Sequence, residues 1–241
     1  MKYSALAFRF RVVVFLLLYL MGFLPPWEQR LAGGGTLWLA ASTLLARTGW
    51  IGLAAATFTV TIAALACLVL GAILRVLGTA FLGSGVMQGV AMQDDPFMAA
   101  GPYGYVRNPL YLGAWLLALG TSILMPPGGA LFFLPAFSLF VLFLIFTEER
   151  FLMAKQAYRY QQYRRRVPRL LPRLGTGAVT AAARPNWLQA VLAEIYPLAF
   201  TLCFAIFAWR YNAHILIRCL LICYGLSLVM RALAKAQPAA A

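Results

Sequence analysis

Two short polar segments interrupt the long apolar runs of this chain. The first is Gly-Pro-Tyr-Gly-Tyr-Val-Arg-Asn-Pro-Leu-Tyr-Leu-Gly at residues 101–113, and the second is the pair Glu148-Glu149. They place two adjacent carboxylates, an arginine, an asparagine and three tyrosines at the ends of apolar segments. Because polar groups at membrane depth are unfavourable unless they have a function, these residues are the first candidates for a site.

The Glu148-Glu149 pair is a candidate for binding a cation. The apolar run before it predicts a membrane helix that ends at this point, and a helix dipole disfavours anions at the C-terminus. A cationic ligand would offset that unfavourable placement. The structural alternative is a solvated helix end whose carboxylates pair with Arg107 or Arg150.

Arg107, Asn108 and Pro109 have the types and order of a helix start. Asparagine favours the N-cap position and proline the first helical position, so we expect a helix to begin at Pro109. The free N–H groups and the positive dipole end of such a helix suit a ligand carboxylate. In the structural alternative, Arg107 reaches toward the membrane surface and Asn108 only caps the helix.

Three tyrosines accompany this helix start, namely Tyr103, Tyr105 and Tyr111. They suit either an aromatic belt at the membrane interface or a stack against a planar ring and a cation. A zwitterion with a sulfonium, a carboxylate and an adenine ring would satisfy all these groups together. S-adenosylmethionine has that description.

The composition indicates a membrane protein. The 241 residues are 63% hydrophobic and 11% charged, with a mean hydropathy of +0.82, whereas a soluble domain is about a quarter charged. The apolar residues come in runs long enough to cross a bilayer, which needs about 20 residues. We predict an all-α polytopic membrane protein with about six transmembrane helices plus short interfacial helices. The expected spans are 12–24, 50–77, 109–125, 131–147, 187–209 and 213–233, with a short helix at 36–46 and a polar helical segment at 148–166.

The basic residues predict the orientation and one partner. The net charge is +14, but no nucleic-acid-binding module is visible and the arginines gather at span ends. We therefore expect anionic inner-leaflet lipids, and not nucleic acid, as the partner. With six spans and a cytoplasmic N-terminus, 16 of the 20 Lys and Arg residues fall on the cytoplasmic side. The positive-inside rule then predicts that both termini are cytoplasmic and that both polar segments share that face.

The cysteines and the single histidine do not form a recognisable metal motif. Cys67, Cys203, Cys219 and Cys223 all lie in apolar runs, and only His214 could add a nitrogen ligand. Buried cysteine commonly acts as a small hydrophobic residue, and a zinc site needs three or four ligands. We expect neither a metal site nor a disulfide.

The order and spacing of the polar motifs resemble a known family. The 101–113 segment is followed by Glu-Glu-x-x-Leu from Glu148, by Tyr-x-x-Tyr from Tyr160 and by Val-Pro-Arg-x-Leu-Pro ending at Pro172. This combination resembles the integral-membrane methyltransferases, which include isoprenylcysteine carboxyl methyltransferase and phosphatidylethanolamine N-methyltransferase. The resemblance covers roughly residues 74–172.

The resemblance implies a cytoplasm-facing pocket for S-adenosylmethionine, with S-adenosylhomocysteine as product. The matching cofactor-binding positions are Gln88, Tyr103, Asn108, Pro109, Leu110, Tyr111, Glu148 and Glu149. Arg107 and Glu149 are the candidate catalytic residues: Arg107 would anchor cofactor or acceptor, and Glu149 or a tyrosine would accept a proton from an amine acceptor.

Two departures bear on the acceptor. The isoprenylcysteine branch has histidine where this chain has Asn108, and arginine one turn before the Glu pair where this chain has Leu144. Both departures disfavour a prenylcysteine carboxylate as acceptor.

We therefore expect a methyltransferase of the cell inner membrane that acts on a lipid or another lipophilic acceptor. Residues 1–77 would hold the first two spans, 78–172 the methyltransferase core and 173–241 a C-terminal pair of spans. Two alternatives remain at this stage. One is an NADPH-dependent reductase of related membrane fold, and the other is a non-enzymatic membrane protein or transporter.

Overall fold

The computed structural model describes residues 10–25, 35–82, 101–155, 157–172 and 185–210, with residues 214, 218, 219, 221, 222 and 225. Its regular elements within these residues are all helical, so the predicted all-α class is confirmed for this part of the chain. In chain order they are α2 (Arg11–Phe23), α4 (Leu37–Arg47), α5 (Leu53–Leu82), the 3-10 turn η1 (Gly101–Gly104), α7 (Pro109–Ser122), α8 (Pro127–Lys155), α9 (Ala157–Arg166), α10 (Trp187–Ala193) and α11 (Ile195–Arg210).

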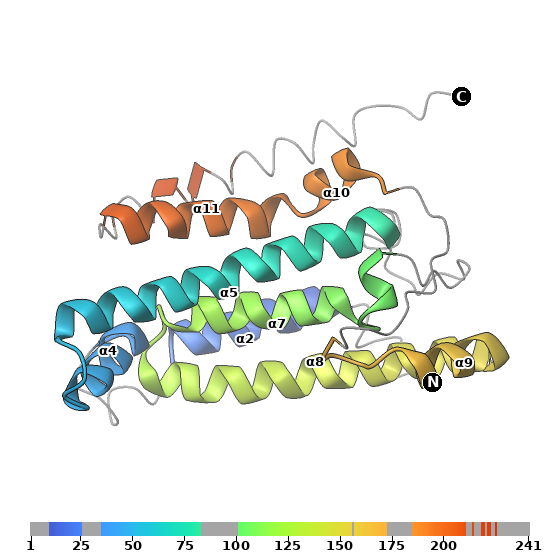
Figure 1. Ribbon diagram of the computed structural model, residues 1–241, viewed down its shortest axis with the longest axis horizontal. Coiled ribbons are helices and arrows are strands. Elements are labelled where there is room, and N and C mark those ends of the chain that lie inside the picture. Colours follow the sequence, from blue (N-terminus) through green and yellow to red (C-terminus); the bar gives the residue numbers. More distant parts are fainter. Residues whose placement is uncertain are drawn as a thin grey trace.

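The helices lie side by side as a bundle (Figure 1). α7 lies between α5 and α8, and α10 and α11 follow the outer side of α5. η1 and α9 lie at one end of the bundle, whereas α4 lies at the opposite end. The motif of residues 101–113 and the last turns of α8 therefore meet at one end.

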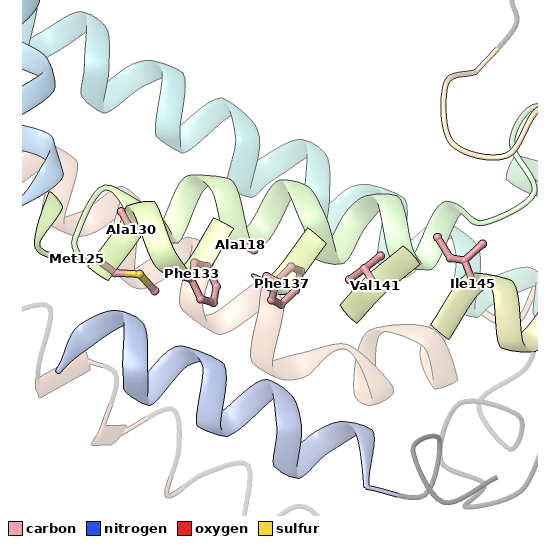
Figure 2. Packing of buried hydrophobic residues seen from close by; sticks show 7 residues of the cluster. All are labelled: Ala118, Met125, Ala130, Phe133, Phe137, Val141 and Ile145. Carbon is pink, nitrogen blue, oxygen red and sulfur yellow. The ribbon is translucent and has the colours of Figure 1, made fainter. Parts of the chain in front are cut away.

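A buried stripe on α8 forms the centre of the core (Figure 2). Phe133, Phe137, Val141 and Ile145 recur every four residues, which places them on one face of a helix. Aromatic side chains of α2 pack against this face: the Phe15 and Phe137 ring centroids are 5.0 Å apart. The residue one turn beyond Ile145 on the same stripe is Glu149.

Small residues let α5 and α7 approach closely. A Cβ atom at Gly71 would lie 2.8 Å from the carbonyl oxygen of Gly113, and a Cβ atom at Gly113 would lie 2.8 Å from that of Gly71. Both distances are too short for a side chain. Glycine at these two positions therefore allows the backbone contact that is typical of membrane helix pairs.

A buried ion pair attaches the C-terminal helices to this core. Glu194 lies at the bend between α10 and α11 and is only 1% exposed. Its carboxylate accepts hydrogen bonds from Arg75 Nε at 2.6 Å, Arg75 Nη2 at 3.0 Å and Thr79 Oγ1 at 2.8 Å, all from α5. These contacts compensate the burial of the charge.

The expected six spans are not confirmed. Among the described residues, two helices are long and apolar enough to cross a membrane, over Leu53–Phe81 and Pro127–Lys155. α10 and α11, bent by 69°, would add a third if they form one broken span. α2 and α4 are apolar but shorter. Most of the expected sixth span, 213–233, lies outside the described residues.

The expected helical segment 148–166 is largely helical, but the expected helix end at the Glu pair was wrong. α8 begins at Pro127 and runs without a break to Lys155, so the turn precedes Pro127 and the pair lies inside the helix. Apolar residues beyond the pair continue the helical packing: Leu152 and Met153 contact Tyr160 and Tyr163 of α9. The argument from an unfavourable dipole at a helix C-terminus therefore does not apply.

Candidate functional site

Glu149 is the centre of a buried three-residue ion network. Its Oε1 accepts from Arg107 Nη1 at 2.8 Å and from Arg169 Nε at 3.1 Å, and its Oε2 accepts from Arg169 Nη2 at 2.7 Å. The Arg107 and Glu149 side chains are each 9% exposed, and that of Arg169 is 29% exposed. The guanidinium of Arg169 also lies 4.5 Å from the ring centroid of Phe146. Both carboxylate oxygens of Glu149 are thus engaged by arginine.

Two hydrogen bonds to main-chain carbonyls join the residues around Arg107 to those around Arg169. The Arg107 N–H donates to the Pro168 carbonyl at 2.8 Å, and Asn108 Nδ2 donates to the Arg169 carbonyl at 3.2 Å. The segment 167–172 is thereby held against the residues that start α7. We call it the closing segment.

α9 continues this attachment through two buried tyrosines. Tyr160 and Tyr163 are 2% and 6% exposed, and with Val167 they form a small apolar cluster. The Tyr163 hydroxyl donates to the Tyr103 carbonyl at 2.7 Å. Burial raises the pKa of Tyr160 to about 12 and raises that of Tyr163 as well. Both phenols therefore stay protonated at neutral pH, and the Tyr163 hydroxyl is a donor.

Glu148 has different surroundings from its neighbour. Among the described residues it makes no ion pair, although the positive charge of Arg11 acts on it from the start of α2. Its carboxylate lies beside the hydroxyl of Tyr111 on α7. It also acts electrostatically on the phenol of Tyr103. Glu148 therefore faces the junction of η1, α7 and α8.

Two buried polar atoms near this junction have no partner among the described residues. They are the Tyr103 hydroxyl and Arg107 Nε. A Cβ atom at Gly78 would lie 3.5 Å from that hydroxyl, so the tyrosine ends against α5. Burial, reinforced by the Glu148 carboxylate, raises the pKa of Tyr103 well above its ordinary value. Since buried polar groups are normally hydrogen-bonded, these two donors indicate a ligand or solvent position beside the network.

An apolar groove of about 330 Å³ borders the same motif. Leu74, Leu77 and Phe81 of α5 form one wall, and residues of η1 and its flank form the other. Val106, next to Arg107, and Pro172, at the end of the closing segment, also line it. The groove therefore adjoins the ion network on the side of α5.

The structure brings most of the predicted site residues to one end of the bundle. Asn108 occupies the N-cap position and Pro109 the first turn of α7, but Asn108 makes no side-chain cap. Leu110 packs against Gly78. Of the two arginines considered as partners of the Glu pair, Arg107 pairs with Glu149, whereas Arg150 is exposed. Gln88 lies outside the described residues.

The sequence reasoning gave no role to Arg169 or Tyr163. Both belong to motifs that were noticed, Val-Pro-Arg and Tyr-x-x-Tyr. The sequence did contain a signal for Arg169: a second arginine motif, Val-Pro-Arg, follows the Glu pair. Among the described residues, no three His, Cys, Asp or Glu side chains gather closely enough to hold a metal ion.

In the part of the chain that the structure describes, these features define a class: a helical protein with membrane-length helices and a polar, arginine-rich candidate site at one end of its bundle. Comparison with known sequences makes the class specific. Residues 50–160 match the sequence model of the family described as phospholipid methyltransferase.

Two curated relatives agree with this match. The chain is 41% identical over 87 residues to methanethiol S-methyltransferase 2 of Bradyrhizobium diazoefficiens, which covers 36% of this chain and 33% of the relative. It is 38% identical over 85 residues to protein-S-isoprenylcysteine O-methyltransferase of Schizosaccharomyces pombe, covering 33% and 34%. The alignments thus span about one third of each relative. No solved structure matches the chain.

Residues 50–160 are therefore similar to the integral-membrane methyltransferases, and the resemblance predicted from the motifs is confirmed. That segment contains Arg107, Asn108 and both glutamates. The closing segment and α10–α11 lie beyond it.

Proposed function

We propose that this protein transfers a methyl group from S-adenosylmethionine to a lipophilic acceptor at the cytoplasmic face of the membrane. The observation that carries the proposal is the contrast between the two adjacent glutamates. Glu149 is neutralised by arginines of the protein, whereas Glu148, beside Tyr111, has no ion-pair partner among the described residues. A carboxylate in that position suits a cationic ligand.

The residues at the junction fit the methyl donor. Glu148 and Tyr111 would face its positively charged part, and Arg107 Nε with the start of α7 would suit its carboxylate. The Tyr103 hydroxyl would gain the partner that it lacks among the described residues. S-adenosylmethionine supplies a methyl group already activated on a sulfonium, so the protein mainly needs to position it and exclude water.

The contacts of Glu149 favour a positioning role. Because three arginine hydrogen bonds occupy its oxygens, it is a poor proton acceptor, and it holds Arg107 and the closing segment in place. The raised pKa values of Tyr103 and Tyr163 also disfavour a tyrosine base. If the acceptor must lose a proton, Glu148 is the better candidate among the described residues.

The apolar groove beside Val106 supports a lipophilic acceptor. Its volume of about 330 Å³ lies at the lower end of the range of ligand sites. The relatives are named for methanethiol and isoprenylcysteine, which differ greatly in size. At Leu144, where the isoprenylcysteine branch has arginine, this chain has a side chain with no exposed surface. That contrast favours an acceptor other than a prenylcysteine carboxylate.

The distribution of basic residues supports the cytoplasmic placement. α9 carries Arg159, Arg164, Arg165 and Arg166 at the end that holds the site. At the opposite end, α4 and α11 finish with single arginines, Arg47 and Arg210. By the positive-inside rule, the site end would face the cytoplasm, as expected for a protein of the inner membrane.

Binding and transfer can be tested separately. Calorimetry in lipid nanodiscs should show binding of S-adenosylmethionine, weakened at least about tenfold by Glu148→Gln, because a charge-assisted contact contributes about 1.5–3 kcal/mol. Tyr103→Phe should weaken binding less, and Tyr105→Phe, at an exposed tyrosine of the same turn, should leave it unchanged. Labelled-methyl transfer into membrane lipids, followed by mass spectrometry, would then identify the acceptor. Absence of binding by the wild type would refute the proposal.

A further inference from the structure

The outward surface of α9 is strongly basic. Arg159, Arg164, Arg165 and Arg166 are all exposed, and Lys155, at the end of α8, is exposed beside them. We call the four arginines the α9 basic face. α9 follows the membrane-length helix α8 after a single residue, so this face lies next to the membrane surface.

The basic face has no counter-ion among the described residues. The carboxylates that the structure describes are Glu148, Glu149 and Glu194. Glu149 and Glu194 pair with Arg107, Arg169 and Arg75, and Glu148 lies beside Tyr111. None of them pairs with an arginine of α9, so the charges of this face remain available to an external anion.

The surroundings of the face favour a lipid headgroup as that anion. Clusters of four or more basic residues directly beyond a membrane helix attract anionic phospholipids. The exposed Tyr158 (74%) and Leu171 (81%) flank the face in sequence, and such side chains anchor protein segments in the interfacial region of a bilayer.

The opposite face of α9 is connected to the site. Tyr163 donates to the Tyr103 carbonyl at 2.7 Å, and α9 leads directly into the closing segment, whose Arg169 binds Glu149. Fixing α9 on the membrane surface therefore fixes both contacts.

We infer that anionic phospholipid headgroups bind the α9 basic face and thereby order the η1 turn and the closing segment around the site. The functional meaning of this lipid contact rests on the proposed methyl transfer, because η1 is part of the proposed cofactor site. The lipid contact and the ordering can each be measured without any methyl transfer.

The lipid contact is tested with spin-labelled lipids. Wild-type protein should prefer spin-labelled phosphatidylglycerol to phosphatidylcholine by at least about fivefold, the effect of roughly one basic residue near the surface. The triple variant Arg164→Gln, Arg165→Gln, Arg166→Gln should lose most of this preference. The control Arg47→Gln, Arg210→Gln, Arg218→Gln removes the same charge from exposed positions elsewhere and should retain it. Equal preference in the two triple variants would overturn the inference.

The ordering is tested by hydrogen exchange at residues 101–107. Phosphatidylglycerol in the nanodisc should slow exchange there in the wild type and in the control, but not in the α9 triple variant. Tyr163→Phe should keep the lipid preference and lose the slowing. Slowing that persists in Tyr163→Phe would refute the connection through this hydrogen bond. If S-adenosylmethionine fails to bind while both lipid effects are present, the proposed function is wrong and the lipid site stands.

Discussion

Replacing each glutamate of the pair separately should have opposite consequences. Glu149→Gln removes the charge that Arg107 and Arg169 share. Arg169 is 29% exposed and can be solvated, but the Arg107 side chain is 9% exposed and would remain buried without a counter-ion. Removing one partner of a buried ion pair costs about 3–5 kcal/mol, and the partial exposure of Arg169 favours the lower value. At about 2–4 °C per kcal/mol for a chain of this size, the melting temperature should fall by about 6–12 °C.

Glu148→Gln is the matched control. It changes the adjacent residue by the same atoms but breaks no ion pair among the described residues, so the melting temperature should stay within about 2 °C, as for most substitutions without a buried partner. Its effect should appear in the affinity for S-adenosylmethionine. Thermal unfolding and calorimetry on the same nanodisc samples measure both quantities. Equal melting temperatures for the two variants, or a larger loss of stability in Glu148→Gln, would refute the division of roles.

Three further predictions follow from the packing and the charges. Glu194→Gln should lower the melting temperature by several degrees and speed hydrogen exchange in α10 and α11, because it leaves the partly buried Arg75 unpaired; unchanged exchange would contradict this attachment. Gly113→Ala should lower the free energy of unfolding by about 1–3 kcal/mol, since its Cβ atom would lie 2.7 Å from Arg75 Cγ and close to the backbone of α5. The control Gly52→Ala, whose Cβ atom would have no atom within 4 Å, should leave the melting temperature unchanged in the same thermal assay. Because burial raises the pKa of Tyr160 to about 12, Tyr160→Phe should leave the shape of the pH–activity profile unchanged up to pH 10, the ordinary pKa of tyrosine; loss of an alkaline limb would indicate that this phenol ionises.

The apolar runs predicted the helices well wherever a run has clear limits. The expected spans 12–24 and 109–125 correspond to α2 and α7, and the expected short helix at 36–46 corresponds to α4. The predicted end of a helix was wrong where the apolar run stops before the helix does. The run of α8 stops at Glu148, but the helix continues because Leu152 and Met153 pack against α9. Hydropathy indicates whether a segment lies in an apolar environment, but it does not show where the helical backbone ends. It therefore placed the C-terminal end of α8 about two turns too early.

The bend at Glu194 was not predicted for a related reason. Residues 187–209 read as one apolar span, with a single carboxylate inside it. What the sequence does not reveal is that Arg75, 119 residues earlier, lies opposite that carboxylate. The pairing depends on how α10 and α11 dock on α5, which local patterns do not determine.

The motifs gave the residues of the candidate site but only part of their arrangement. The motifs selected Arg107, Asn108 and the Glu pair, and the structure brings these together with Tyr103 and Tyr111 at one end of the bundle. The expected side-chain cap by Asn108 is absent, because its amide instead binds the closing segment. That contact joins residues 61 positions apart, and only the folded chain shows it.

Helix geometry explains why two adjacent glutamates are useful where one would not be. Consecutive residues of an α-helix point about 100° apart, so Glu149 continues the buried stripe of Phe137, Val141 and Ile145 while Glu148 faces α7. A carboxylate on the stripe must be neutralised from within the protein, and Arg107 and Arg169 do this while fastening the closing segment. Under the proposed function, its neighbour Glu148 would then be left to face the ligand. A single glutamate at either position would supply only one of these two roles, which is why we expect the two substitutions to separate stability from binding.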